Sequence, residues 1–233
     1  MCHSWRVDLF RKFVVDFIAN SMKIELASIT NKINEPDLEE YKELLIKMIE
    51  NCAQVLIKFE TNRPEPLLLM GADNEAEKEI NNYALSLMGD FSNEDKIYQT
   101  IDSLRHAFCS FAYNGLHQLY TRQENEVWYP KVVLNEILEP NDIETLDDPI
   151  ILYRGCSISE YENTNYGQAW STSKERAYDF AFQHYASQPW FDKNKRVVLK
   201  TKYPKDKVLY SDQSVEYEVV IQPEHLAEIE KCT

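Results

Sequence analysis

The spacing of apolar residues changes near residue 149, and this change constrains the fold more than any other feature of the chain. Before it, apolar side chains recur every three or four residues over long stretches, as on one face of an α-helix. After it, short runs alternate apolar with polar side chains or are rich in strand-forming residues. The sequence therefore predicts an α+β protein with a helical amino-terminal region and a strand-rich carboxyl-terminal region.

Residue types that favour helix ends mark the limits of several helices that this spacing predicts. The apolar stripe over 38–59 follows a run of acidic residues, which favours the positive end of a helix. Asn74 and Gly89 are residue types that start and end a second helix, and Asn93 opens a third. The apolar segment 127–138 contains a proline and predicts a further helix that begins near it.

Four strands are predicted in the last third of the chain, at 149–153, 168–172, 196–202 and 216–221. The first is a buried run that stops at Gly155, where the chain is expected to open into a loop. Between the second and the third, residues 174–182 have helical spacing, and the Ser173 hydroxyl is placed to cap that helix. In the fourth, alternation places Glu216 and Glu218 on one face of the strand.

Three short motifs lie on these predicted strands or at their ends. In chain order they are Tyr153-Arg154-Gly155, Ser171-Thr172-Ser173 and Glu216-Tyr217-Glu218. Each motif has an ordinary interpretation on its own: Arg-Gly after a strand is usually a turn, a serine-threonine pair before a helix is usually a cap, and alternate acids are usually a solvated face. Their occurrence together, in this order, favours a common site.

The order Arg-Gly, Ser-Thr-Ser, Glu-x-Glu resembles the arginine-serine-glutamate clade of mono-ADP-ribosyltransferases, which includes cholera-toxin-like and clostridial binary-toxin-like enzymes. The resemblance covers roughly residues 150–223. It implies an ADP-ribosyltransferase-like split β-sheet core that binds NAD+ as its substrate. An arginine rather than a histidine at position 154 argues against the diphtheria-toxin-like and poly-ADP-ribose branch of the same superfamily.

The resemblance also implies a role for each motif. Arg154 would hold the phosphate or ribose of NAD+, and the Gly155 backbone would clamp the nicotinamide amide. The segment Ser171-Thr172-Ser173 would shape the pocket and orient the catalytic glutamate. That glutamate would be Glu218, and Glu216 would set the choice of acceptor, which is typically arginine.

The chemistry of such a reaction asks for these residue types independently of the resemblance. Cleavage of the glycosidic bond of NAD+ builds positive charge on the ribose, so a fixed carboxylate such as Glu218 lowers the barrier. The Arg154 guanidinium can bind a diphosphate through paired hydrogen bonds, and Gly155 allows close approach of a flat amide. Glu216 can orient a protonated acceptor arginine and help to remove its proton.

Two further residues are candidates for NAD+ contacts. Trp190, in a loop broken by a proline, can stack on nicotinamide, although anchoring of the loop is the commoner role of such a side chain. Arg196 belongs to a basic strip between Lys193 and Lys207 that can meet NAD+ phosphates or a nucleic-acid backbone. A solvated edge strand is the ordinary explanation of the same strip.

The cysteines and histidines indicate neither a disulfide framework nor a metal site. The five cysteines are widely spaced without a CxxC pair, and Cys156 is predicted to be a packed thiol rather than a nucleophile. The five histidines show no ligand spacing, so no metal is expected. Charged residues interrupt the apolar stretch 5–26, which therefore predicts neither a membrane span nor a signal peptide. The protein is expected in the cytoplasm, or delivered into the cytoplasm of a target cell.

Charge is unevenly divided at the change of spacing. Residues 1–149 carry 14 Lys and Arg against 27 Asp and Glu, whereas residues 150–233 carry 11 against 12. Nearly all of the net charge of −14 is therefore expected on the helical part. Such a field is typical of a solvated helical surface, and it also suits a docking face for a basic partner.

The sequence therefore predicts a helical region over 1–90, for docking of a partner or acceptor, and an ADP-ribosyltransferase catalytic domain over 91–233. The leading function is transfer of ADP-ribose from NAD+ to a macromolecular acceptor, with protein arginine favoured by the Glu-x-Glu motif. Transfer to RNA or DNA and simple hydrolysis of NAD+ are the alternatives. By analogy alone, a toxin or effector of this kind in a toxin-antitoxin or phage-defence setting would need an inhibitory antitoxin or immunity protein as a partner.

Overall fold

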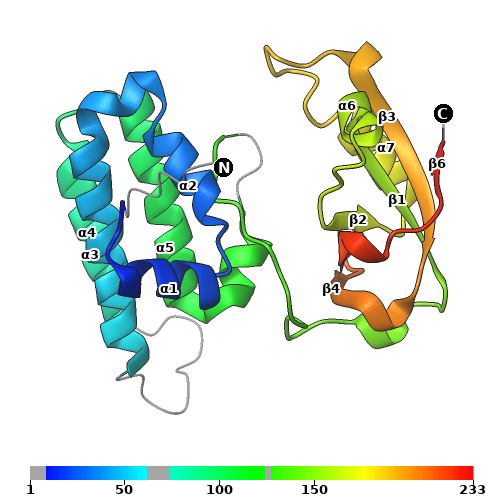
Figure 1. The fold of residues 1–233 in the computed structure, drawn as a ribbon, viewed down its shortest axis with the longest axis horizontal. Coiled ribbons are helices and arrows are strands. Elements are labelled where there is room, and N and C mark those ends of the chain that lie inside the picture. Colours follow the sequence, from blue (N-terminus) through cyan, green and yellow to red (C-terminus); the bar gives the residue numbers. More distant parts are fainter. Residues whose placement is uncertain (1–8, 62–73, 124–126, 233) are drawn as a thin grey trace, which may run out of the picture. The chain divides into compact units, whose positions relative to one another are not determined.

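The computed structural model describes residues 9–61, 74–123 and 127–232. By its internal contacts the chain divides into two compact units, residues 1–133 and residues 134–233. Figure 1 shows that the first is helical and that the second contains a sheet with short helices. The described residues form seven α-helices and one six-stranded antiparallel sheet, which confirms the predicted α+β class.

The described part of the first unit is built from five α-helices. Their bounds are α1 Lys12–Asn20, α2 Leu26–Ile33, α3 Lys42–Thr61, α4 Glu75–Met88 and α5 Lys96–Thr121, and a 3₁₀ helix, η1 Pro36–Tyr41, directly precedes α3. Helices α3, α4 and α5 pack side by side (Figure 1). Leu45, Ile80 and Leu104, one from each of the three, are fully buried, so their apolar stripes form the core of this unit.

Helix α4 lies between the two residues predicted to bound it, and side-chain capping is present at its first end. The Asn74 side chain accepts a hydrogen bond from the Glu77 amide at 3.0 Å, and Gly89 follows the last helical residue. Helix α5 begins at Lys96, later than the predicted start at Asn93, because a turn occupies the residues just before it.

The helix predicted over 127–138 is wrong. In the described structure this segment is extended, and Val132 forms an isolated bridge with Ile24. Val132 and Leu134 are buried. Burial at alternate positions suits an extended chain, whereas a helix would turn these two side chains to different faces. The segment is therefore an extended connection that buries some of its apolar side chains.

The boundary between the compact units lies after Val133, whereas the sequence placed a boundary between residues 90 and 91. Helix α5 packs on α3 and α4, so it belongs to the first unit. This division changes the distribution of charge. Residues 1–133 carry 14 basic against 21 acidic residues, and residues 134–233 carry 11 against 18. Each unit has a net charge of −7, so the predicted concentration of charge on the helical part is wrong, because the six acids between 134 and 149 belong to the sheet unit.

The second unit is organised around the sheet. Its elements are β1 Ile150–Ser157, α6 Ile158–Glu162, β2 Ala169–Ser171, α7 Lys174–Phe182, β3 Arg196–Tyr203, β4 Val208–Asp212, β5 Glu218–Ile221 and β6 Ile229–Lys231. The strand order is β4-β5-β2-β1-β3-β6, with every neighbouring pair antiparallel. Strands β1 and β3 form the longest ladder, over eight paired positions. The segments that carry the three motifs are therefore neighbours in one sheet.

The two faces of this sheet are covered differently. On one face, here called the α7 face, Ala177 and Ala181 of α7 pack against Val198, with Tyr153 beside them. On the other face, here called the core face, lies the larger apolar cluster. It contains Leu152, Cys156, Trp170, Val197, Leu199, Val219 and Ile221. Because side chains alternate along a strand, each motif residue can be assigned to one of these faces.

Two of the predicted strand ends need correction. Strand β1 does not stop before Gly155 but continues to Ser157, paired with β3 over its whole length. Strand β5 begins at Glu218 rather than at Glu216. Tyr217 has a φ of 54°, in the left-handed region, which breaks the extended backbone just before the strand.

Candidate functional site

Glu218 is the first residue of β5, and it lies on the α7 face of the sheet. It is paired with Ser171 of β2 and with Asp212 of β4, and Ser171 is in turn paired with Tyr153 of β1. The next residue, Val219, points to the core face. One row of side chains therefore crosses four strands and contains residues from all three motifs, Tyr153, Ser171 and Glu218 among them.

The Glu218 carboxyl has a strongly perturbed acidity. Burial, together with the nearby carboxylates of Glu216 and Asp212, raises its pKa to about 7. A carboxyl that is desolvated and held near other acids is typical of catalytic sites, because such a group can be ionised or protonated at neutral pH. Among the described residues Glu218 is the acidic group with this property.

The Ser171-Thr172-Ser173 segment ties β2, α7 and the chain before β5 together. Ser171 Oγ donates to the Glu216 carbonyl at 3.1 Å and accepts from the Ser173 amide at 3.1 Å. The Thr172 amide donates to the Tyr217 carbonyl at 3.0 Å. Ser173 Oγ accepts from the Arg176 amide at 3.2 Å and caps α7, as predicted. The segment thus fixes the backbone on which both glutamates stand.

A glutamine adds a further link that the sequence did not reveal. Gln213 Oε1 accepts from the Thr172 hydroxyl at 2.5 Å, and Gln213 Nε2 donates to the Glu218 carbonyl at 3.1 Å. The backbone amide of Gln213 donates to Asp142 Oδ2 at 2.7 Å. This side chain closes the loop between β4 and β5 over the start of β5. No local pattern could have identified it, since its partners come from three separate segments.

Glu216 and Glu218 do not share one face of a strand, so that prediction is wrong. The left-handed backbone at Tyr217 turns Glu216 out of the strand, and its carboxylate accepts from Arg176 Nη2 at 2.8 Å. The Glu216 side chain is 46% exposed. Arg176 also has its guanidinium 5.0 Å from the Phe180 ring. No local pattern indicates this pair, because 40 positions separate its members.

Arg154 lies on the core face, between Leu152 and Cys156 along β1. Its Nε and Nη2 donate to the two carboxylate oxygens of Glu160, at 2.5 and 3.3 Å. Nη1 donates to the Ala169 carbonyl. The guanidinium is therefore bound on both edges by α6 and by the start of β2, and its side chain is only 20% exposed.

Two glycines fit closely around these elements. A Cβ on Gly155 would lie 2.1 Å from the Ala177 carbonyl oxygen and 2.6 Å from the Ala181 amide nitrogen. A Cβ on Gly167 would lie 2.6 Å from Arg154 Nη2. Position 155 therefore requires a glycine for a reason that the sequence did not show: α7 packs directly on the backbone of β1.

The three motifs are neighbours in the sheet, but their functional side chains do not converge. Ser171 and Glu218 share the α7 face, whereas Arg154 points to the core face. The predicted arrangement, with Arg154 and Glu218 facing one bound molecule, is not present in the described structure. The serine and glutamate motifs form one assembly, and Arg154 with Glu160 forms another on the opposite side.

The remaining candidates lie in the loop after α7 and along β3. Trp190 is 59% exposed, and its ring centroid lies 5.4 Å from that of Tyr185. Arg196 donates to the carbonyls of Phe180 and Ala181 at the end of α7, so its guanidinium is occupied by the helix. Strand β3 lies between β1 and β6, so the basic strip does not lie on an edge strand.

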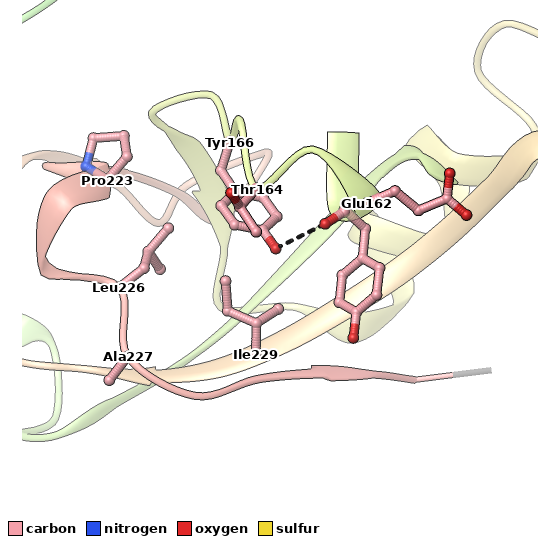
Figure 2. Close-up of a pocket in the computed structure, with 8 residues that line it drawn as sticks. Glu162, Thr164, Tyr166, Pro223, Leu226, Ala227 and Ile229 are labelled. Carbon is pink, nitrogen blue, oxygen red and sulfur yellow. Dashed lines mark hydrogen bonds between the residues drawn. The ribbon is translucent and has the colours of Figure 1, made fainter. Parts of the chain in front are cut away.

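A separate pocket of about 480 Å³ lies beside the core face, among α6, the 3₁₀ helix η5 Pro223–His225 and β6. Figure 2 shows Tyr166 and Thr164 facing Leu226 and Ile229 across it. The Tyr166 hydroxyl donates to the Tyr161 carbonyl at 3.4 Å. None of the three motifs lines this pocket.

The thiols and the possible metal ligands add no further centre to the described structure. The Cys156 thiol is packed in the core cluster, and burial raises its pKa to about 12. No cluster of three or more His, Cys, Asp or Glu side chains suited to a metal occurs in the described ranges. Likewise, no helix within those ranges is both long and apolar enough to cross a membrane.

Comparison with known proteins finds no matching family model, no matching curated protein and no matching solved structure.

Proposed function

We propose that residues 134–233 form an ADP-ribosyltransferase-like core that transfers ADP-ribose from NAD+ to a macromolecular acceptor. In this core, Glu218 assists cleavage of the bond between nicotinamide and ribose. One observation carries this proposal: the Glu218 carboxyl, with a pKa raised to about 7, stands in register with Ser171 and close to a second glutamate. A serine strand beside a pair of glutamates is the arrangement that the serine and glutamate motifs of the resembled enzymes imply.

The proposed chemistry uses the ionised form of Glu218. When the bond between nicotinamide and ribose breaks, nicotinamide leaves with the electron pair and positive charge develops at the ribose C1′ carbon. A carboxylate in a partly desolvated site stabilises that charge more strongly than one in water. Because half of the Glu218 carboxyls are protonated near pH 7, the rate of cleavage should rise between pH 6 and pH 8.

The roles proposed for Arg154 and Gly155 change in the light of their contacts. Arg154 reaches an NAD+ phosphate only by exchanging Glu160 for it, since Glu160 binds the fork of the guanidinium. Gly155 lies beneath α7. We therefore propose that both residues position other elements. Arg154 holds the first residue of β2, and Gly155 lets α7 pack closely on β1.

A second candidate function, simple hydrolysis of NAD+, is favoured by the contact between Arg176 and Glu216. An acceptor arginine that used Glu216 would first have to displace Arg176, which is 2.8 Å from that carboxylate. Water needs no such displacement. This contact weakens the support for protein arginine as the acceptor, while leaving bond cleavage at Glu218 unaffected.

The test is a cleavage and transfer assay on the full chain with NAD+ labelled in its adenylate portion. Glu218→Gln should lower nicotinamide release by about 10²- to 10³-fold, as loss of one electrostatic stabiliser usually does. The exposed Glu224, replaced in Glu224→Gln, is the matched control. Full activity of Glu218→Gln, or no nicotinamide release by the unmodified protein, would contradict the proposal.

Two further variants separate the candidates. If Glu216 serves an arginine acceptor, Glu216→Gln should lower transfer to protein while nicotinamide release persists. If Glu216 acts only through its contact with Arg176, Arg176→Gln should reproduce every effect of Glu216→Gln. Equal loss of transfer and release in Glu216→Gln would assign Glu216 to cleavage or to folding.

A further inference from the structure

A series of aromatic rings extends from α7 into the loop that follows it. The ring centroids of Phe180 and His184 are 5.0 Å apart, those of His184 and Tyr185 are 4.6 Å apart, and those of Tyr185 and Trp190 are 5.4 Å apart. His184 is exposed, and Trp190 is 59% exposed. The series therefore presents aromatic faces to solvent, and we call it the aromatic surface.

The aromatic surface begins beside the candidate catalytic carboxylates. The Arg176 guanidinium carbon lies 5.0 Å from the Phe180 ring, at one end of the series, and Arg176 Nη2 binds Glu216. Glu216 stands two positions before Glu218. A molecule that lay along these rings would thus be led by α7 toward the two glutamates.

Two lysines lie in the loop just after the aromatic surface. Lys193 Nζ is 5.8 Å from the ring of Phe182, which lies between Phe180 and His184 in sequence. The Lys195 side chain is 80% exposed, and its Nζ lies 3.7 Å from Asp192 Oδ2. Residues 174–196 contain five basic and three acidic residues, in a chain whose net charge is −14. The vicinity of the aromatic surface is therefore locally positive.

Exposed rings beside cations form the combination that binds unpaired nucleotides. Each base stacks on an aromatic face, and each phosphate is attracted to a lysine, without any need for a particular base sequence. A duplex cannot use such a surface in the same way, because its bases are already stacked on one another. An apolar protein partner would offer no counter-charge to Lys193, and Lys195 has only the contact of 3.7 Å with Asp192.

We propose that the aromatic surface, with Lys193 and Lys195, docks single-stranded nucleic acid, and that this strand is the acceptor of ADP-ribose. Docking does not depend on the proposed function, but transfer rests on it. In transfer, the glycosidic C–N bond of NAD+ breaks and nicotinamide leaves with the electron pair. A hydroxyl or amine of the strand then bonds to ribose C1′ and releases its proton to water.

The docking test measures fluorescence anisotropy of labelled single strands of about 12 nucleotides, a length within the usual site size, with the full chain and no NAD+. RNA and DNA strands are separate arms, and a duplex of the same sequence is a third. Both single strands should bind more tightly than the duplex. Trp190→Ala should weaken binding by roughly 5- to 100-fold, as loss of one stacking partner does, whereas Trp190→Phe should retain most of it.

Charge is tested through the salt dependence of binding. Replacing both Lys193 and Lys195 by alanine should reduce the slope of log affinity against log salt by about 1.4, which corresponds to two phosphates on a single strand. Tyr113→Ala and Lys47→Ala, at exposed positions of the first unit, are matched controls and should leave affinity unchanged.

The outcomes separate docking from catalysis. Equal affinity of Trp190→Ala and the unmodified chain, or a loss of binding that follows a change in oligomeric state on size exclusion, overturns the docking surface. Glu218→Gln should bind the strands as the unmodified chain does. If the strands bind but receive no label from NAD+ while NAD+ is consumed, the acceptor assignment fails alone. If no NAD+ is consumed, the proposed function fails and docking stands.

Discussion

The two faces of the sheet in residues 134–233 differ in what they do with the motif residues. The α7 face carries Ser171 and Glu218 in one cross-strand row, with an acid whose pKa is raised to about 7. The core face carries Arg154, which is bound to Glu160 and to the start of β2. The first face therefore holds a carboxyl with a perturbed pKa, whereas Arg154 on the second face ties β1 to α6 and to β2.

This difference shows that neighbours in a sequence motif need not act on one ligand. Tyr153 and Arg154 are consecutive in β1, so their side chains leave opposite sides of the sheet. Ser171 and Glu218 are far apart in sequence, yet they are directly paired. Cross-strand register, rather than motif order, decides which residues share a site.

The largest expected effect concerns the attachment of the α7 face. Gly155→Ala should destabilise the protein by about 3 kcal/mol or more, because the added methyl meets the backbone of α7, which cannot yield without separating from β1. Thermal or urea unfolding followed by circular dichroism measures this. Gly89→Ala is the matched control, since a Cβ there has no neighbour closer than 3.9 Å. Equal stability of the two variants would mean that α7 does not pack tightly on β1.

An intermediate effect concerns ionisation of Glu218. Its pKa is raised to about 7 in the folded chain, above the ordinary value of 4.5, so the folded state holds the proton more tightly than the unfolded state does. Ionisation therefore costs stability progressively from pH 4.5 to pH 7, and the full cost is present above pH 7. Glu218→Gln removes that cost and should raise the free energy of unfolding by about 2 kcal/mol at pH 8, with little change near pH 4.5.

Urea unfolding of both chains at the two pH values measures this difference. The exposed Glu224→Gln variant should track the unmodified chain at both values. A stability difference for Glu218→Gln that is the same at pH 4.5 and pH 8 would show that Glu218 is not the group whose ionisation opposes folding. Under the proposed function, the same variant should be slower in catalysis and more stable at neutral pH, which is a trade typical of catalytic sites.

The smallest expected effect concerns the core face. A double-mutant cycle of Arg154→Ala and Glu160→Ala should give a coupling of about 1–2 kcal/mol in stability, because both side chains are about 20% exposed and the contact is bidentate. The same cycle on Arg11 and Glu50 is the matched control. It should give less than about 1 kcal/mol, since Arg11 is 57% exposed. If Glu160→Ala leaves stability unchanged while Arg154→Ala raises the KM for NAD+, Arg154 serves the ligand and not the fold.

Local signals in the sequence were sufficient for much of the fold. Asn74 and Ser173 cap helices where their residue types predict caps, because capping depends on residues within one turn. The strands β1, β2 and β3 follow apolar patterns that span a few residues each. The extended segment at 127–138 was missed because a short apolar run with a proline has the same composition in either state.

The candidate site depends on contacts that local patterns do not encode. The sequence identified Glu218 and Ser171, but their pairing depends on the register between β2 and β5. Arg176 and Glu160, which bind Glu216 and Arg154, carry no motif and become visible only through the packing of α7 and α6. The face to which each side chain points could not be predicted, because a shift of one residue in strand register moves every side chain to the opposite face.

The left-handed backbone at Tyr217 gives the two glutamate side chains different directions. In an unbroken strand, Glu216 and Glu218 would stand about 7 Å apart on a single face. Instead, the left-handed backbone at Tyr217 directs the Glu216 side chain to Arg176, while Glu218 is paired in the sheet. A ligand that draws the Glu216 side chain from Arg176 would leave the Glu218 carboxylate in place. Under the proposed function, substitutions in the β4–β5 loop can therefore change the choice of acceptor without moving Glu218.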